Sequence, residues 1–238
     1  MPTVLITGAS RGLGLEMVRQ YAQAAWDVIA TCRNPHKAEE LQQLRRRWSG
    51  SVLIDMLDVT HPAQIESLAG KYASTPIDLL INNAGELGPR GAARELIHKQ
   101  YFGSLDYESW LKVLEVNTLG PVRVAETFAE QVERSAQKKM IFISSTMGSN
   151  VAGDSVAFAY CSSKAALNKC VTMLARALRS RGIVVAAVCP GHVKTAMGGP
   201  GATVDPHDSV AGLRKVIAGL ALADSGRFLR YDGTDIPW

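Results

Sequence analysis

Tyr160 and Lys164, four residues apart, are the side chains of this sequence best spaced for acid–base chemistry. Residues at this spacing project from one face of a helix. A phenol has a pKa of about 10 and is a poor acid at neutral pH, but a nearby ammonium favours the phenolate and lowers that pKa. The pair therefore indicates a proton donor and its activator, although Tyr-x-x-x-Lys alone also occurs on ordinary solvated helices.

A glycine-rich turn near the amino end indicates a phosphate site. An apolar run at 3–7 precedes the turn and apolar residues at helical spacing follow it, which is typical of strand, turn and helix. The first N–H groups of a helix lack intrahelical partners, and glycines let a pyrophosphate approach the backbone. The spacing Gly-x-x-x-Gly-x-Gly, at Gly8, Gly12 and Gly14, differs from the common Gly-x-Gly-x-x-Gly. A plain strand-to-helix turn is the alternative.

Strands and helices alternate along the chain, which predicts a Rossmann-like, doubly wound α/β fold. We expect a seven-stranded parallel sheet with helices on both faces, in a single domain over 1–238, because no linker or repeat interrupts the pattern. Strands are expected at 3–7, 26–32, 52–57, 77–81, 140–143, 183–188 and 227–231. Helices are expected from residue 12, from 35 to 48, after 60, at 106–133, at 157–181 and after 205.

Polar and small residues follow the expected strands. Ligands of an open parallel sheet bind at the carboxyl ends of its strands, so a long ligand laid across the sheet is indicated. The strand ends carry 8–14, Arg33, Asp58, 82–85, Ser144, Ser145, Pro190 and Gly191.

The composition excludes several other classes of protein. An apolar fraction of 47% is typical of a globular chain, and the net charge of +4 is mild. The one basic run, 45–47, is explained by a solvated helix end, so no nucleic-acid partner is expected. No apolar run approaches the roughly 20 residues of a membrane helix, and no signal peptide is visible. We therefore expect a cytoplasmic protein without a membrane partner, whose four scattered cysteines are reduced thiols and bind no metal.

Taken together, the motifs resemble the short-chain dehydrogenase/reductase family over essentially the whole chain. The C-terminal run 224–238 is similar to the C-factor and Sniffer-type carbonyl reductase branch of that family. The motifs that carry the family resemblance are Thr7-Gly8-x-x-x-Gly12-x-Gly14, Asn82-Asn83-Ala84-Gly85, Asn117, Ser145, Tyr160-x-x-x-Lys164 and Pro190-Gly191.

The resemblance implies four catalytic residues. Tyr160 would protonate a carbonyl oxygen as hydride arrives from the nicotinamide, and Ser145 would hold that oxygen. Lys164 would bond the nicotinamide ribose and lower the tyrosine pKa, while Asn117 would order a water that passes protons to Lys164. Because Ser145 lies two residues further from Tyr160 than in the commonest family pattern, Ser144 stays open as the catalytic serine.

The resemblance also implies a site for NADP(H). Asp58 and the Val59 backbone would meet the adenine, 83–85 would line the cofactor, and Val193 and Thr195 would hold its carboxamide side. The expected cofactor-binding residues are Gly8, Ser10, Arg11, Gly12, Leu13, Gly14, Arg33, Asp58, Val59, Asn83, Ala84, Gly85, Tyr160, Lys164, Pro190, Gly191, Val193 and Thr195.

Charge at the end of the second expected strand favours NADP over NAD. An NAD-preferring site places an acid there, whereas this sequence has Cys32-Arg33, and Asp27 lies at the wrong end of the strand. Arg11, in the glycine turn, is a second cation. Two guanidinium groups suit a 2′-phosphate, which they bind through paired hydrogen bonds. The alternative is that both arginines merely face solvent.

The function implied is NADPH-dependent reduction of a small-molecule aldehyde, ketone or quinone. Its alternatives are a C-factor-like, nucleotide-binding signalling protein with little turnover, and an alcohol dehydrogenase working in the oxidising direction. The substrate pocket would come from 86–105, 146–156 and 197–206. A homodimer or homotetramer would pair through the helices at 106–133 and 157–181, where apolar Leu167, Val171, Leu174 and Leu178 serve either that interface or the core.

Overall fold

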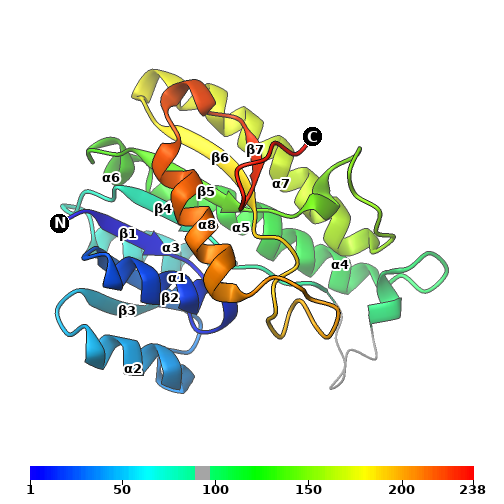
Figure 1. Cartoon of the computed structure of the whole chain (residues 1–238), viewed down its shortest axis with the longest axis horizontal. Coiled ribbons are helices and arrows are strands. Elements are labelled where there is room, and N and C mark those ends of the chain that lie inside the picture. The colour runs from blue at the N-terminus through cyan, green and yellow to red at the C-terminus, as the bar shows by residue number, and fades with distance from the viewer. Residues whose placement is uncertain (89–96) are drawn as a thin grey trace.

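A parallel sheet of seven strands forms the centre of this computed structural model, which describes residues 1–88 and 97–238 (Figure 1). The strands lie in the order β3-β2-β1-β4-β5-β6-β7. All seven lie within two residues of the expected bounds, so the predicted fold class is confirmed. They are β1 (Thr3–Ile6), β2 (Asp27–Cys32), β3 (Val52–Met56), β4 (Leu79–Asn82), β5 (Lys139–Ile143), β6 (Val184–Cys189) and β7 (Phe228–Arg230).

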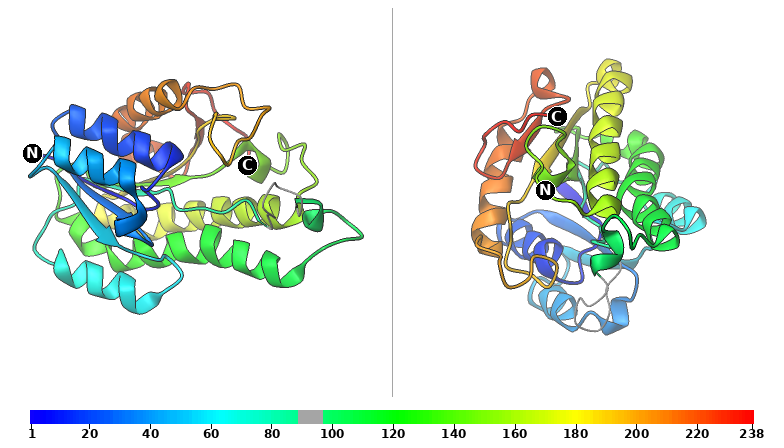
Figure 2. Two further views of the ribbon diagram at one scale, coloured as in Figure 1. Left: turned by 90° about the horizontal axis from the view of Figure 1, so that it is seen from below. Right: turned by 90° about the vertical axis from the view of Figure 1, so that its right-hand side faces the viewer.

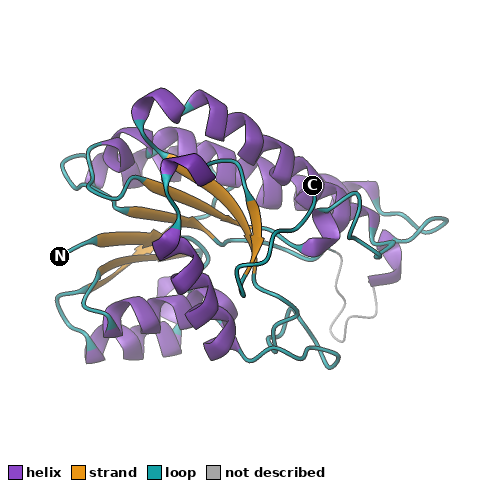
Figure 3. Ribbon diagram, turned by 45° about the horizontal axis from the view of Figure 1, so that its top comes forward, coloured by secondary structure: helices purple, strands orange, loops and turns teal. Residues whose placement is uncertain are grey.

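Helices cover both faces of the sheet because each inner strand is apolar on both sides. Successive side chains of a strand point to opposite faces: Val4 and Ile6 join one core cluster, and Leu5 joins the other. The first cluster packs under α1 (Gly12–Gln23), α2 (Glu39–Arg47) and α8 (Pro206–Gly219). The second packs under α3 (Pro62–Lys71), α5 (Gly120–Thr127), α6 (Ala129–Glu133) and α7 (Phe158–Ala177). Figures 2 and 3 show these layers.

The direction in which strands are added to the sheet changes between β1 and β4, which pair side by side. From β1 the chain adds β2 and β3 on one side, and it then returns to add β4 on the other side of β1. Such a switch point opens a crevice at the carboxyl edge of the sheet. In Figure 1 the loops after β4 and β6 extend from this edge towards the right. The fold thus brings the expected site residues to one edge.

The expectation of one continuous helix over 106–133 is wrong. The segment is α4 (Tyr107–Leu114), a π-helical turn (Glu115–Leu119), α5 and α6. Pro121 has no N–H to donate to the carbonyl of Asn117, so the regular hydrogen-bond ladder cannot pass this point. Gly120 lets the widened turn approach β3's end closely, since a Cβ there would lie 2.9 Å from Val59 Cγ2. The turn buries Asn117 completely.

Two smaller differences concern the helices after β2 and β5. Pro35 opens a 3₁₀ turn, Pro35–Lys37, and α2 begins only at Glu39, while Asn34 makes no capping bond. The helix expected at 157–181 ends at Ala177 and continues as a 3₁₀ turn.

The apolar positions of α7 belong to the core. Leu167 and Val171 are 1% and 0% exposed, Leu178 is buried, and Leu174 packs partly against the same cluster. Among the described residues, no helix is long and apolar enough to cross a membrane.

Candidate active site

The carboxyl ends of β1 and β4 form the base of the candidate site. Asn83, directly after β4, donates from Nδ2 to the backbone oxygens of Thr7 at 2.9 Å and Gly8 at 3.1 Å. In return, Thr7 Oγ1 accepts the N–H groups of Asn83 and Ala84, each at 3.0 Å. These bonds hold the glycine turn and the end of β4 as one unit at the switch point.

Gly8 and Gly14 allow the turn after β1 to lie against the end of β4. Gly8 has φ +69°, and a Cβ there would lie 2.8 Å from Ala84 Cα. A Cβ at Gly14 would lie 2.6 Å from Asn83 Nδ2. A side chain at either position would force the two segments apart. The packing of the protein itself thus requires glycine at both positions and holds the start of α1 against the end of β4. The first N–H groups of such a helix are suited to phosphate oxygens.

Gly85 lies close to Asn117 and Lys164, on the other side of the site. A Cβ on Gly85 would lie 3.4 Å from Asn117 Oδ1 and 3.8 Å from Lys164 Nζ, which are ordinary contact distances. The packing of the protein alone therefore does not require glycine here. A Cβ here would nevertheless contact both Asn117 and Lys164, so Gly85 lies directly beside these two candidate site residues.

Tyr160 and Lys164 lie on the first turns of α7, as the spacing predicts. Both are buried, and Lys164 Nζ lies 5.8 Å from the centroid of the Tyr160 ring. The same nitrogen donates to the backbone oxygen of Ile143, at the end of β5, at 2.8 Å. Burial lowers the pKa of Lys164 to about 8, and Cys189 acts in the opposite direction. An ammonium has three N–H donors, so the bond to Ile143 leaves capacity for a ligand.

The side-chain amide of Asn117 is used for structure. Its Nδ2 donates to the Glu86 oxygen at 2.7 Å and to Ser163 Oγ at 3.0 Å. Its Oδ1 accepts the Glu86 N–H at 2.8 Å. Asn117 thus ties the loop after β4 to α7, one residue before Lys164.

The two serines after β5 have different surroundings. Ser144 is 2% exposed, and its Oγ donates to Asn168 Oδ1, on α7, at 2.6 Å. Ser145 is partly exposed, and its Oγ accepts the N–H of Met147 at 3.2 Å, capping the 3₁₀ turn Thr146–Gly148. Its hydroxyl proton remains able to reach a ligand, which favours Ser145 over Ser144 for contact with a substrate.

The expected adenine end of the site lies beyond β2 and β3. Asp58 Oδ1 accepts the N–H and the hydroxyl of Thr60, at 3.0 and 2.8 Å. Burial raises the pKa of Asp58, but these bonds, with His61 and Arg33 nearby, more than offset it and keep the pKa below its usual value. Arg11, at the N-cap of α1, and Arg33, directly after β2, are both exposed.

The loop after β6 carries Val193 and Thr195 back towards the glycine turn. Thr195 lies against that turn, because a Cβ on Gly12 would be 3.4 Å from Thr195 Cγ2. Val193 is buried and bridges to Val204, and Thr195 Oγ1 accepts the N–H of Gly198 at 3.2 Å. The structure therefore brings the residues expected at the carboxamide close to the turn expected at the pyrophosphate.

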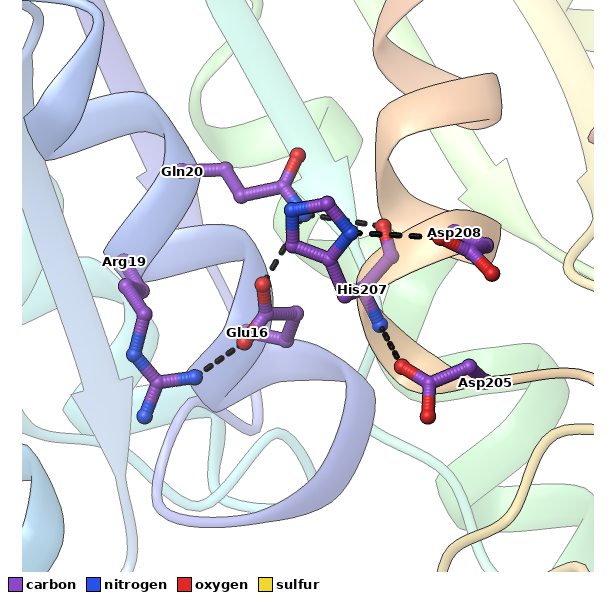
Figure 4. A network of polar contacts seen from close by, with 6 residues as sticks. All are labelled: Glu16, Arg19, Gln20, Asp205, His207 and Asp208. Carbon is purple, nitrogen blue, oxygen red and sulfur yellow. Dashed lines mark hydrogen bonds and ion pairs between the residues drawn. The ribbon is translucent and has the colours of Figure 1, made fainter.

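The far end of this loop is anchored to α1 behind the glycine turn (Figure 4). Gln20 Nε2 donates both to Glu16 Oε1 and to the backbone oxygen of His207, each at 2.9 Å. Glu16 also pairs with Arg19. Asp205 caps α8 by accepting the His207 N–H at 2.9 Å, as the Asp-Pro sequence predicts.

A cavity of about 520 Å³ lies elsewhere, along the outer side of α7. Lys169, Arg176 and Trp238 line it, and it includes neither Tyr160 nor Lys164. The candidate site is thus identified by the types and placement of its side chains, and not by a cavity. No cluster that could hold a metal ion occurs within 1–88 and 97–238.

The sequence patterns identified most of the candidate site residues at this edge but not the residues that hydrogen-bond to them. Thr7, Ser163 and Asn168 bond the site residues Asn83, Asn117 and Ser144. Thr7 stands inside the glycine motif, but nothing in the sequence marks Ser163 or Asn168. Residues 89–96 of the expected substrate loop lie outside the described residues.

A doubly wound parallel sheet with a glycine turn at its switch point defines a Rossmann-type, nucleotide-binding α/β protein. Residues 2–203 match the family described as short chain dehydrogenase. The chain is 39% identical to C-signal of Myxococcus xanthus over 175 residues, which cover 73% of this chain and 100% of C-signal.

Solved structures of two carbonyl reductases are similar over the whole chain. The NADPH-bound enzyme from chicken fatty liver has a TM-score of 0.87 at 32% identity, covering 100% of this chain and 99% of that one. The carbonyl reductase Sniffer of D. melanogaster has a TM-score of 0.87 at 28% identity, covering both chains completely. The chain belongs to the short-chain dehydrogenase/reductase family of oxidoreductases.

Proposed function

We propose that this protein is an NADPH-dependent carbonyl reductase, which converts an aldehyde, ketone or quinone to an alcohol. The observation that carries the proposal is the placement of Tyr160 beside the buried Lys164, whose Nζ lies close to Gly85. Burying a cation costs stability, as the lowered pKa of Lys164 indicates. Its position next to a phenol suits proton transfer, and the similarity to NADPH-bound carbonyl reductases supports the same reaction.

In the proposed reaction, NADPH supplies the hydride that the carbonyl carbon accepts. Tyr160 donates its phenolic proton to the carbonyl oxygen, and Ser145 Oγ–H donates a hydrogen bond to the same oxygen. Lys164, charged at neutral pH, favours the phenolate that this transfer leaves and bonds the ribose hydroxyls with its remaining N–H groups. A water held near the backbone of Asn117 would return a proton through Lys164.

The residues present fit the cofactor. The first N–H groups of α1, after the glycine turn, suit the pyrophosphate, and the Lys164 ammonium close to Gly85 suits the hydroxyls of the nicotinamide ribose. Arg11 and Arg33, both exposed, would hold the 2′-phosphate. No acid follows β2 to hold the free ribose hydroxyls of NAD. We therefore propose that NADP(H) is preferred.

The remaining expected contacts complete this proposed site. Asp58 and the Val59 backbone would meet the adenine, and Val193 and Thr195 the carboxamide. The other contacts would come from Ser10, Leu13, Asn83, Ala84, Pro190 and Gly191.

A second candidate function is supported by the similarity to C-signal, the relative with 39% identity. Under this alternative the chain binds nucleotide and signals with little turnover. The buried Lys164 beside Tyr160 disfavours this alternative, since a protein that only binds nucleotide has little need of a proton-transfer pair. An oxidising dehydrogenase would use the same site in reverse.

Turnover distinguishes these candidates. The purified protein would be screened with NADPH against a set of aldehydes, ketones and quinones, following the loss of NADPH absorbance. We expect reduction of at least one class. NADPH binding without turnover on the whole set, in either direction, would contradict the enzyme and favour the signalling role.

We also propose that the chain acts as one domain that forms a homodimer or homotetramer. Leu111, Leu119 and Met173 are exposed by 68%, 54% and 57%, on the segments that the family resemblance assigns to pairing. Light scattering at micromolar concentration tests this, and a monomeric mass would contradict it. Four unpaired cysteines support a reducing, cytoplasmic compartment.

A further inference from the structure

Gln100 is a buried glutamine that the proposed reaction leaves without a role. It ends the 3₁₀ turn Ile97–Gln100, and only 1% of its surface is exposed. Its Oε1 accepts the backbone N–H of Tyr160 at 3.1 Å, and its Nε2 donates to the backbone oxygen of Leu87 at 2.8 Å. The orientation of the amide is unambiguous, because a backbone N–H only donates and a carbonyl only accepts.

The bond to Tyr160 satisfies a group that α7 cannot satisfy itself. Tyr160 is the third residue of the helix, so its N–H has no acceptor in the preceding turn. Such a group is usually bonded by the side chain of the N-cap residue. The N-cap here is Ala157, which has no acceptor on its side chain. Gln100 therefore supplies, from a separate segment, the cap that α7 lacks.

The other end of the Gln100 amide holds the loop after β4. Leu87 follows Glu86, whose N–H and carbonyl are both bonded to Asn117. Gly88, with φ +118°, packs directly on the glutamine, since a Cβ there would lie 2.6 Å from Gln100 Nε2. The loop is thus held by two successive amides, first Asn117 and then Gln100.

We propose that Gln100 is a positioning residue that keeps the backbone of Tyr160 in register with the loop after β4. Asn117 reaches α7 through Ser163 Oγ, and Gln100 reaches it through the Tyr160 N–H. The loop and the start of α7 consequently move together, which fixes the phenol relative to anything bound beside Gly85. The catalytic consequence rests on the proposed function, whereas the cap itself does not depend on turnover.

The first test is Gln100→Met, which keeps the volume of the side chain and removes both hydrogen bonds. A misplacement of about 1 Å costs on the order of 10²-fold in rate, so kcat should fall by roughly 10–100-fold. The Kd for NADPH should stay unchanged, because the phosphate and ribose contacts are elsewhere. The Tyr160 amide should exchange faster with deuterium, measured by mass spectrometry on peptides from the start of α7.

Gln131→Met is the matched control. Gln131 is 5% exposed and donates its Nε2 to the Ala69 oxygen at 3.2 Å, between α6 and α3. This variant loses a bond of the same kind from an equally buried amide. It should leave both kcat and exchange at Tyr160 unchanged.

A rescue separates capping from packing. Ala157→Ser places a hydroxyl at the N-cap of α7, where it can accept the N–H of the third helical residue. In the Gln100→Met background it should restore part of kcat and slow the exchange at Tyr160. A role of Gln100 in packing alone would not respond to a hydroxyl at Ala157.

Normal kcat and normal exchange in Gln100→Met would overturn the proposal, as would a loss of kcat that Ala157→Ser leaves unrepaired. If the native protein reduces no carbonyl, the proposed function fails, and the exchange measurement still decides the role of Gln100. Should Gln100→Met not fold, Gln100→Glu keeps an oxygen towards Tyr160 and should preserve its protection. Rapid exchange in that variant would likewise overturn the proposal.

Discussion

The titration of Lys164 should make NADPH binding depend on pH near pH 8. Burial lowers the pKa of Lys164 to about 8, and Cys189 opposes this only in part. About nine-tenths of the molecules therefore carry the ammonium at pH 7, and about one-tenth carry it at pH 9. A charged donor contributes about 1.5–3 kcal/mol to a hydrogen bond and a neutral one about 0.5–1.5 kcal/mol. The difference corresponds to a rise of about tenfold in the Kd for NADPH between pH 7 and pH 10.

Fluorescence of bound NADPH, titrated across this range at constant ionic strength, measures the effect. Tyr160→Phe should keep the same midpoint, because Lys164, whose ammonium is proposed to bond the cofactor, remains in place. Lys164→Arg should bind NADPH with a Kd that is independent of pH, since a guanidinium stays charged throughout. A Kd that stays flat in the native protein, or a midpoint that disappears in Tyr160→Phe, would refute the reasoning.

The remaining predictions concern the cofactor end, the serines and the stability of the free protein. Arg33→Ala should raise the KM for NADPH about tenfold or more and leave that for NADH unchanged in steady-state kinetics. If the native protein uses NADH as well as NADPH and the variant changes neither KM, the arginine is a bystander. Ser145→Ala should lower kcat on the order of 10²-fold with little change in Tm. Ser144→Ala should instead lower the free energy of unfolding by about 1–3 kcal/mol, because it leaves Asn168 Oδ1 without its donor. If Ser144→Ala lowered kcat and Ser145→Ala lowered stability, Ser144 would be the catalytic serine and Ser145 the structural one. Lys164→Met should raise the Tm at pH 7. The pKa of Lys164 is about 8 in the native protein and about 10.4 in the unfolded chain. The buried charge therefore lowers the free energy of unfolding in full below pH 8 and by less as the pH rises. An unchanged or lower Tm in calorimetry would show that the ammonium is not destabilising.

The sequence was sufficient to predict the strands and the edge at which the site lies. Alternation of apolar runs with helical spacing determines the sheet, and parallel strands end at one edge. The residues after β1 and β4 therefore had to meet, as Gly8 and Asn83 do. The Tyr160 and Lys164 spacing predicts a common face of α7, which the structure confirms.

Contacts between distant segments could not be predicted from local patterns. The spacing of apolar residues over 106–133 gives no sign of the π-helical turn, which depends on Pro121 and on the close approach of Gly120 to Val59. The cap that Gln100 gives to Tyr160 joins residues 60 positions apart. The separate environments of Ser144 and Ser145 likewise depend on where Asn168 lies on α7.

The most direct test of the central claim is the turnover of Tyr160→Phe with NADPH and a carbonyl that the native protein reduces. Removing the phenolic proton should lower kcat on the order of 10²–10⁴-fold, which is the usual contribution of a positioned general acid. NADPH should still bind with its native Kd, because the lost hydroxyl serves the reaction more than the cofactor. Near-normal reduction by this variant would contradict the account, since it would remove Tyr160 from the proposed mechanism.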